Sequence, residues 1–159
     1  MKRLIAGAVV AGVAVFAGVG ALGDETTRNE QGTIEEGGGL GAFRIQQGDC
    51  LNLPTETLVA SVEGVPCWEP HDAQAYYLFD MTGYTDYPGE TAITSAADNG
   101  CIAQFHPFVG KSYELSELDI TWLAPTADSW SEFDDREITC MVVTMDGSQL
   151  DETMRGSGR

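Results

Sequence analysis

The sequence predicts an α+β fold in which a small antiparallel sheet packs against one main helix and two disulfides hold the structure together. Three observations predict it. Apolar residues alternate with period two on both sides of a central stretch in which they recur every four residues. The four cysteines all follow an apolar N-terminal segment. An even number of cysteines in that position favours a small exported domain with its thiols paired.

Residues 1–23 are interpreted as a targeting segment, either a cleaved signal peptide or an N-terminal membrane anchor. Lys2 and Arg3 form a short positive region, and residues 4–22 carry no charged side chain. Small residues near position 20 suit cleavage, whereas a run of about 20 apolar residues is also long enough to span a bilayer. In both cases the positive residues hold the N-terminus inside, so we expect an extracytoplasmic protein, membrane-anchored or secreted.

The rest of the chain fits one domain with flexible ends. Residues 24–42 are predicted to be an acidic, Gly-rich linker, because their only large aliphatic side chains are Ile34 and Leu40. Residues 151–159 are predicted to be a flexible tail. The folded, extracytoplasmic domain is therefore expected at residues 43–150.

The formal net charge of −17 limits the partners. Such a chain repels nucleic acid and anionic lipid headgroups, so we expect no nucleic-acid partner and a membrane contact only through the N-terminal segment. An acidic surface attracts cations or basic peptides, but a solvated surface without a ligand has the same composition.

The first half of the domain is expected to form strands. A short strand is predicted at residues 58–62, before a turn at Glu63-Gly64. A longer one follows, in which alternate positions are apolar and share one face, namely Ala73, Ala75, Tyr77, Phe79 and Met81. This alternation predicts a strand with one buried face.

A helix and two more strands follow. Pro88 can start the helix, a core-facing stripe recurs every four residues from Ile93 to Phe105, and Pro107 is expected to end it. The next strand buries Leu118, Ile120, Trp122 and Ala124 on one face, and Pro125 ends it. The last strand places Ile138, Cys140 and Val142 on one face and Met141 and Val143 on the other.

This arrangement selects a disulfide pairing. Cys101 lies on the core stripe of the helix and Cys140 on the apolar face of the last strand, so these two are predicted to pair. Cys50 and Cys67 then pair around the first strands. Zinc is not expected, because no two cysteines lie two to four residues apart.

The chain from Gly48 onward resembles the septum formation-related domain family of actinobacterial exported and membrane proteins. The resemblance rests on motifs that occur in order: Gly48-Asp49-Cys50-Leu51, Val65-Pro66-Cys67, Pro70-His71-Asp72-Ala73, Tyr87-Pro88-Gly89-Glu90, and a closing stretch with Trp130, Arg136 and Cys140. One departure is Gln74, where family members often have a carboxylate. A second is the absence of the usual glycine before Arg136.

The resemblance implies an outer-face domain, often tethered by a transmembrane helix and connected with division septa or the cell envelope. It implies no established catalytic residue. The chain itself offers His71 beside Asp72 as a possible base or metal ligand. Neighbouring strand residues point to opposite faces, so a structural histidine that hydrogen-bonds within the Pro70 turn is the favoured interpretation.

The sequence gives less support to a serine nucleophile or to a calcium site. No serine lies in a Gly-x-Ser-x-Gly context. A cluster of carboxylates lacks the order of a calcium loop; it comprises Asp128, Glu132, Asp134, Asp135 and Glu137. We therefore expect no cofactor, no metal and no catalytic residue.

Aromatic residues are the remaining candidates for binding. Trp68, Tyr84 and Tyr87 lie in or near the turn between the long strand and the helix, and Trp130 follows later. Exposed rings on a rigid scaffold bind peptides or sugars. The expected function is thus a non-enzymatic, envelope-associated interaction module that contacts an envelope protein or a cell-wall component. The alternative is a cell-envelope hydrolase or metal-dependent enzyme that uses His71.

Overall fold

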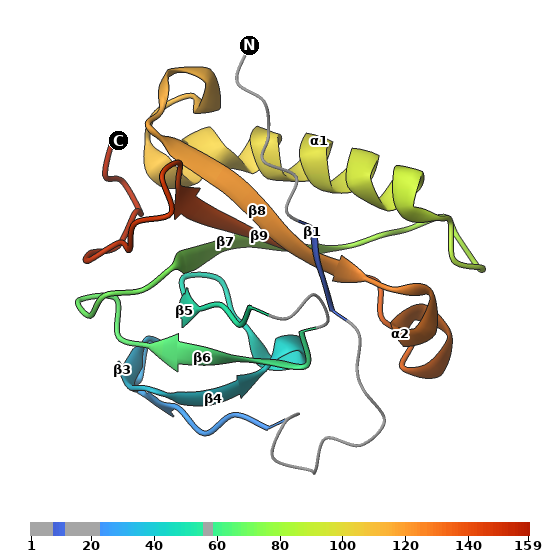
Figure 1. Cartoon of the computed structure of the whole chain (residues 1–159), viewed down its shortest axis with the longest axis horizontal. Helices are drawn as coiled ribbons and strands as arrows, with labels where there is room; N and C mark the ends of the chain where they lie inside the picture. Colours follow the sequence, from blue (N-terminus) through green and yellow to red (C-terminus); the bar gives the residue numbers. More distant parts are fainter. Residues whose placement is uncertain (1–7, 12–22, 56–58) are drawn as a thin grey trace.

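The computed structural model describes residues 8–11, 23–55 and 59–159, which form three layers (Figure 1). The helix α1 (Glu90–Val109) covers one face of a layer made by β7 (Ala73–Asp80), β9 (Glu137–Thr144) and β8 (Leu118–Pro125). The strands β5 (Cys50–Asn52), β6 (Ser61–Val65) and β4 (Gly38–Gly41) form the layer on the other face. The predicted α+β class with one main helix is confirmed.

One sheet connects both strand layers, with the strand order β1-β8-β9-β7-β5-β6-β4. Its described pairings are antiparallel except that β1 (Ala8–Ala11) runs parallel to β8. A second, two-stranded sheet pairs β2 (Thr27–Arg28) with β3 (Ile34–Glu36). The short helix α2 (Ala127–Glu132) and two 3₁₀ turns, η2 (Ala42–Arg44) and η3 (Tyr113–Leu115), complete the elements.

The main core lies between α1 and the β7–β9–β8 layer. The predicted stripe is buried as expected, since Ile93, Ala97, Cys101 and Phe105 are at most 5% exposed. They meet the predicted apolar faces of β8 and β9. Both predicted disulfides, Cys101–Cys140 and Cys50–Cys67, are present.

The helix continues past the expected stop. Pro107 lies inside α1, which ends at Val109, so the prediction that Pro107 ends the helix was wrong. Phe108 and Val109 are buried, and Gly110 adopts the left-handed conformation that closes a helix, with its N–H donating to the His106 carbonyl. Burial of the last turn outweighs the hydrogen bond that proline removes.

The C-terminal tail provides further caps for this helix end. The N–H groups of Gly156 and Gly158 donate to the carbonyls of Phe108 and Val109, each at 2.8 Å. Met154 is fully buried in the main core, and Arg159 forms an ion pair with Glu117 at 2.6 Å. The expectation of a flexible tail was therefore wrong, because unsatisfied helix carbonyls and an apolar side chain hold residues 151–159 in place.

A β-bulge in β7 changes the expected facing of that strand. The pairing with β9 shifts between Ala75 and Tyr77. Ala73 and Ala75 therefore pack in the core beside β5 and β6, whereas Tyr77 and Phe79 pack against the α1 core. The single apolar face that alternation predicted is divided between two cores, because the extra residue reverses the alternation.

The predicted linker is also folded. Ile34 and Leu40 are 2% and 0% exposed, and β4 pairs with β6. A Cβ on Gly38 would lie 2.6 Å from the carbonyl oxygen of Glu25, so the glycine here permits a close backbone approach. Residues 23–41, called the arm below, are thus part of the domain rather than a spacer.

The predicted targeting segment falls largely on residues 1–7 and 12–22, which lie outside the described residues, as does Leu58 at the start of the first predicted strand. The observed strand there, β6, begins at Ser61. None of the helices in the described part of the chain combines the length and apolar character that a membrane-spanning segment needs.

Candidate functional site

A pocket of about 360 Å³ lies where the arm, the first disulfide and the C-terminal tail meet. Three separate parts of the chain contribute to it, and we call it the polar pocket. Its lining is Gln31, Gly32, Thr33, Gln46, Gln47, Gly48, Asp49, Cys67, Gln74, Thr153 and Arg155. The volume falls in the range of about 300–1,000 Å³ that is typical of small-molecule sites.

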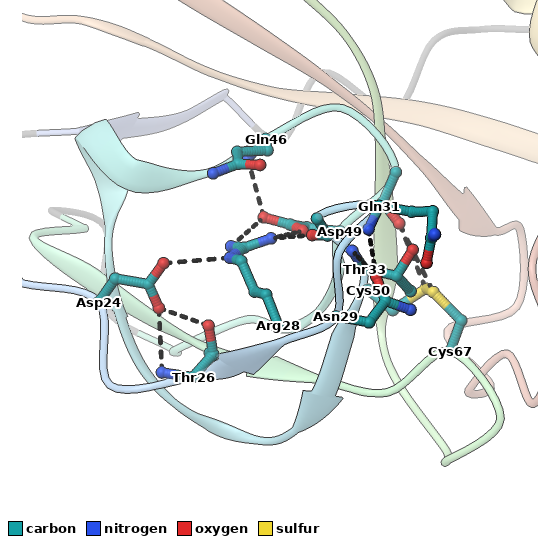
Figure 2. Close-up of polar contacts among 12 residues, drawn as sticks. Asp24, Thr26, Arg28, Asn29, Gln31, Thr33, Gln46, Asp49, Cys50 and Cys67 are labelled. Carbon is teal, nitrogen blue, oxygen red and sulfur yellow. Dashed lines mark hydrogen bonds and ion pairs between the residues drawn. A yellow bond between two sulfur atoms is a disulfide. The ribbon is translucent and has the colours of Figure 1, made fainter.

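The arm contributes a tight turn to the rim. The side-chain oxygen of Asn29 accepts hydrogen bonds from the N–H groups of Gln31 and Thr33, each at 3.0 Å (Figure 2). Gly32 has a φ of +83°, which suits glycine, and its N–H donates to the Asn29 carbonyl. The turn therefore presents Gln31 and Thr33 to the pocket.

A buried ion pair fastens this turn to the domain. Two guanidinium nitrogens of Arg28 lie 2.6 and 2.9 Å from the carboxylate oxygens of Asp49, which also accepts the N–H of Gln46 at 2.8 Å (Figure 2). The side chains of Arg28 and Asp49 are 13% and 3% exposed. Hydrogen bonding to Asp49 raises the pKa of Arg28 above its usual value, despite partial burial. The negative charge of Asp49 is thereby compensated by Arg28.

Arg28 also contacts the start of the arm. It forms an ion pair with Asp24 at 3.1 Å and donates to the Gly32 carbonyl at 2.8 Å. Burial tends to raise the pKa of Asp24, but hydrogen bonds from Thr26 and Arg28 outweigh it, so that pKa lies below its usual value. One guanidinium thus joins the start of the arm, the turn and the loop before β5.

The base of the pocket is formed by Gln74 and the first disulfide. Gln74 is 2% exposed; its amide nitrogen donates to the carbonyl of Gly48 and to the hydroxyl of Thr153, both at 3.0 Å. Its amide oxygen accepts the N–H of Met154 at 2.7 Å. A carboxylate at this position could not donate to the Gly48 carbonyl, so the amide suits this chain's contacts. Gln74 therefore joins the tail to the pocket.

The tail supplies the pocket with Arg155. Its guanidinium carbon lies 4.7 Å from the centroid of the Phe108 ring, a cation–π contact. Asp49 and Arg155 are the charged residues of the lining, and Asp49 is already paired with Arg28. The pocket thus offers hydrogen-bonding amides and hydroxyls around one positive charge.

His71 lies in the core rather than in the polar pocket. Its side chain is fully buried, Nδ1 lies 2.7 Å from the Glu69 carbonyl oxygen, and its backbone pairs with Leu150. The carboxylate of Asp72 instead accepts the N–H of Leu53 at 2.9 Å. The geometry is that of a structural histidine within the turn, and the two side chains form no dyad.

The structure separates the aromatic candidates. Trp68 is 64% exposed in the turn before β7, whereas Tyr84 is 48% exposed in the turn after it. A strand rises about 3.3 Å per residue, so β7 places these turns roughly 20 Å apart. Tyr87 is half-buried and packs edge-on against Trp130 at 5.9 Å between centroids.

Trp130 is buried and cannot present its ring to a partner. It is 3% exposed, its indole N–H donates to the Thr85 carbonyl at 3.1 Å, and the Arg136 guanidinium lies 3.8 Å from the ring centroid. The four aromatic residues therefore do not make one binding patch. Trp68 follows Cys67, which lines the polar pocket, so it is the aromatic candidate nearest in sequence to that site.

The buried member of the acidic cluster, Asp135, makes hydrogen bonds within the domain. Asp135 accepts the hydroxyl hydrogen of Ser129 at 2.8 Å and the N–H of Glu137 at 3.1 Å; burial raises the pKa of Asp135 despite these bonds. Asp134 pairs with Arg136 at 2.8 Å. Within residues 8–11, 23–55 and 59–159, no group of three or more His, Cys, Asp or Glu side chains is placed to hold a metal ion.

Sequence reasoning missed the polar pocket because it assigned two of its three walls to a linker and a flexible tail. The pair Gln46-Gln47 directly before Gly48-Asp49-Cys50 was the available signal, since amides next to a disulfide motif suit a polar surface. The distant contributions of residues 31–33 and 153–155 carried no local signal.

Fold and site together define a small, disulfide-stapled α+β domain with a polar pocket. The model of the Septum formation family matches residues 45–158, so the chain belongs to that family. Family membership supports a role related to cell division. No curated protein and no solved structure shows significant similarity to the chain.

Proposed function

We propose that this protein is a non-enzymatic, extracytoplasmic module of the cell-division apparatus that binds an envelope protein or a cell-wall component through the polar pocket. The observation that carries the proposal is the composition of that pocket. Amides, hydroxyls and one guanidinium supply hydrogen bonds and positive charge. Such a set recognises a ligand, whereas acyl or phosphoryl transfer requires an activated nucleophile or metal.

The pairing of the cysteines in disulfides supports the proposed extracytoplasmic location. All four cysteines are paired, and one of the two disulfides borders the polar pocket. Disulfides persist in oxidising compartments and are rare where thiols are kept reduced. The ligand is accordingly sought among envelope proteins and wall components on the outer face of the membrane.

The alternative of an envelope hydrolase that uses His71 has no support in the geometry. A general base must reach the proton that it abstracts, whereas this ring is fully buried and Nδ1 already contacts the Glu69 carbonyl. The exposed residues that line the polar pocket are therefore better candidates for contact with a partner.

Site-specific crosslinking in growing cells tests the proposal. A photoreactive amino acid replaces exposed Gln46 on the pocket rim or, in a matched control, exposed Ser95 on α1. We expect adducts with an envelope protein or wall fragment from position 46, enriched at septa, and few from position 95. Mass spectrometry of the adducts identifies the partner. Equal yields at both positions, or no adduct at position 46, would contradict a pocket-centred interaction.

Replacement of Trp68 in the same way shows whether the contact extends beyond the pocket. Its 64% exposure makes the substitution structurally mild. Adducts shared with position 46 would place Trp68 at the rim of the interface. Their absence would restrict the interface to the pocket and remove Trp68 from the candidate residues.

A further inference from the structure

We infer that the ligand of the polar pocket is a peptide segment that ends in a free carboxylate, and that Arg155 binds this carboxylate. The inference rests on the proposed function and specifies the ligand of the same site. It is carried by the placement of Arg155, by the charge balance around it and by the side chains that face it.

Arg155 is held in place but has no acidic partner. Its guanidinium stacks on Phe108, its own N–H donates to the Thr153 hydroxyl at 3.3 Å, and the next residue, Gly156, is bound to the end of α1. Arg28, Arg136 and Arg159 each form an ion pair, whereas Arg155, like the exposed Arg44, forms none within the described ranges. In a chain with 25 acidic and 8 basic side chains, this leaves a positioned guanidinium for an external anion.

The surroundings of Arg155 admit a negative charge. Asp49, the acidic residue of the pocket lining, is bound by two nitrogens of Arg28 and is 4% exposed. Its charge is thus compensated inside the protein. An incoming carboxylate would meet the planar, two-pronged donor of Arg155, which matches carboxylate geometry.

The remaining rim suits a peptide group better than a simple anion. The side chains of Gln31, Thr33 and Gln46 are exposed, and in the described structure their polar side-chain atoms make no hydrogen bond within the protein. Each glutamine amide both donates and accepts, as a peptide group does. A volume of about 360 Å³ provides room for a short peptide end next to Arg155.

Two sources present this chemistry, the C-terminus of an envelope protein and a peptide of the wall. Titration calorimetry on oxidised protein purified from the envelope of its source separates them. The probes are N-acetyl-L-Ala-L-Ala and N-acetyl-D-Ala-D-Ala, each compared with its C-terminal amide. Tighter binding of the L form assigns a protein terminus, and tighter binding of the D form assigns a wall peptide.

Arg155→Gln is expected to weaken binding of the preferred acid by about tenfold, the factor that corresponds to about 1.4 kcal/mol. The preferred acid should also bind about tenfold more tightly than its amide, and the difference should shrink as salt screens the exposed pair. Arg44→Gln is the matched control, because it removes the same charge from an exposed residue that does not line the pocket. It should leave binding unchanged.

Equal affinity for acid and amide, equal loss in both arginine variants, or no binding of any probe would overturn the inference. Unchanged unfolding midpoints confirm that the variants are folded. If crosslinking at position 46 still captures an envelope partner when the acids show no preference, the carboxylate inference fails while the proposed function stands.

Discussion

The two faces of the β7–β9–β8 layer are covered in different ways. On the α1 side, the core buries large rings such as Tyr76, Phe105 and Trp122 together with the Cys101–Cys140 disulfide. On the other side, the core consists of smaller side chains such as Leu40, Val62 and Ala75, and glycine backbone approaches its neighbours closely. The first side is held by apolar area, and the second depends more on polar contacts.

This difference sets the character of the polar pocket. On the α1 side, a cavity of about 310 Å³ lies at the start of the helix and is lined largely by apolar side chains such as Ile93, Trp122 and Ala124. The arm is fastened by the Arg28–Asp49 ion pair and by glycine contacts, so polar side chains remain at its edge and line a cavity. The side with the smaller apolar core therefore carries the more polar of these two cavities.

Removal of the α1 disulfide is expected to have the largest effect on stability. The variant Cys101→Ala/Cys140→Ala should lower the free energy of unfolding by about 4 kcal/mol, because the chain-entropy model assigns that value to a loop of this length. Urea unfolding followed by tryptophan fluorescence measures the change.

The other disulfide gives the matched comparison. Cys50→Ala/Cys67→Ala should lose about 3 kcal/mol from its shorter loop, and it should weaken ligand binding because Cys67 borders the pocket. If the α1 variant lost less stability than this one, or lost more ligand affinity, the division between the two sides would be wrong.

Loss of the ion pair between Arg28 and Asp49 is expected to have the next largest effect on stability. Arg28→Ala should reduce the free energy of unfolding by roughly 3 kcal/mol, because Asp49 would remain buried without its cation. Arg44→Ala, which removes an exposed arginine outside the pocket, should change it by less than about 0.5 kcal/mol. Similar unfolding midpoints for the two variants would show that the arm does not depend on this pair.

The smallest expected effect on stability comes from the close backbone contact between Gly38 and Glu25 in the arm. Gly38→Ala should destabilise the protein by roughly 1–3 kcal/mol, because the new Cβ would meet the Glu25 carbonyl oxygen at 2.6 Å. Gly39→Ala should have less effect, since its Cβ would meet only the movable carboxylate of Glu25 at 3.0 Å. Thermal unfolding of both variants gives the comparison, and a neutral Gly38→Ala would show that the arm can shift away.

On the α1 side, local patterns identified the main buried faces. The four-residue spacing from Ile93 to Phe105 and the alternation in β8 and β9 identified the buried faces, because each pattern lies within one element. The pairing of Cys101 with Cys140 followed from those faces. The same reasoning failed in β7, where a bulge reversed the alternation, and at Pro107, where burial of the next turn carried the helix further.

By itself, the sequence determined the fold class, the main helix with its core strands and both disulfides, since periodicity and cysteine position record which faces are apolar. Only the tertiary structure decided that the arm and the tail belong to the domain and that they enclose a pocket. The physical reason is that these segments are held by contacts between residues far apart in the chain: Arg28 with Asp49, Gln74 with Met154, and Gly156 with Phe108. Composition and local periodicity do not reveal such pairs.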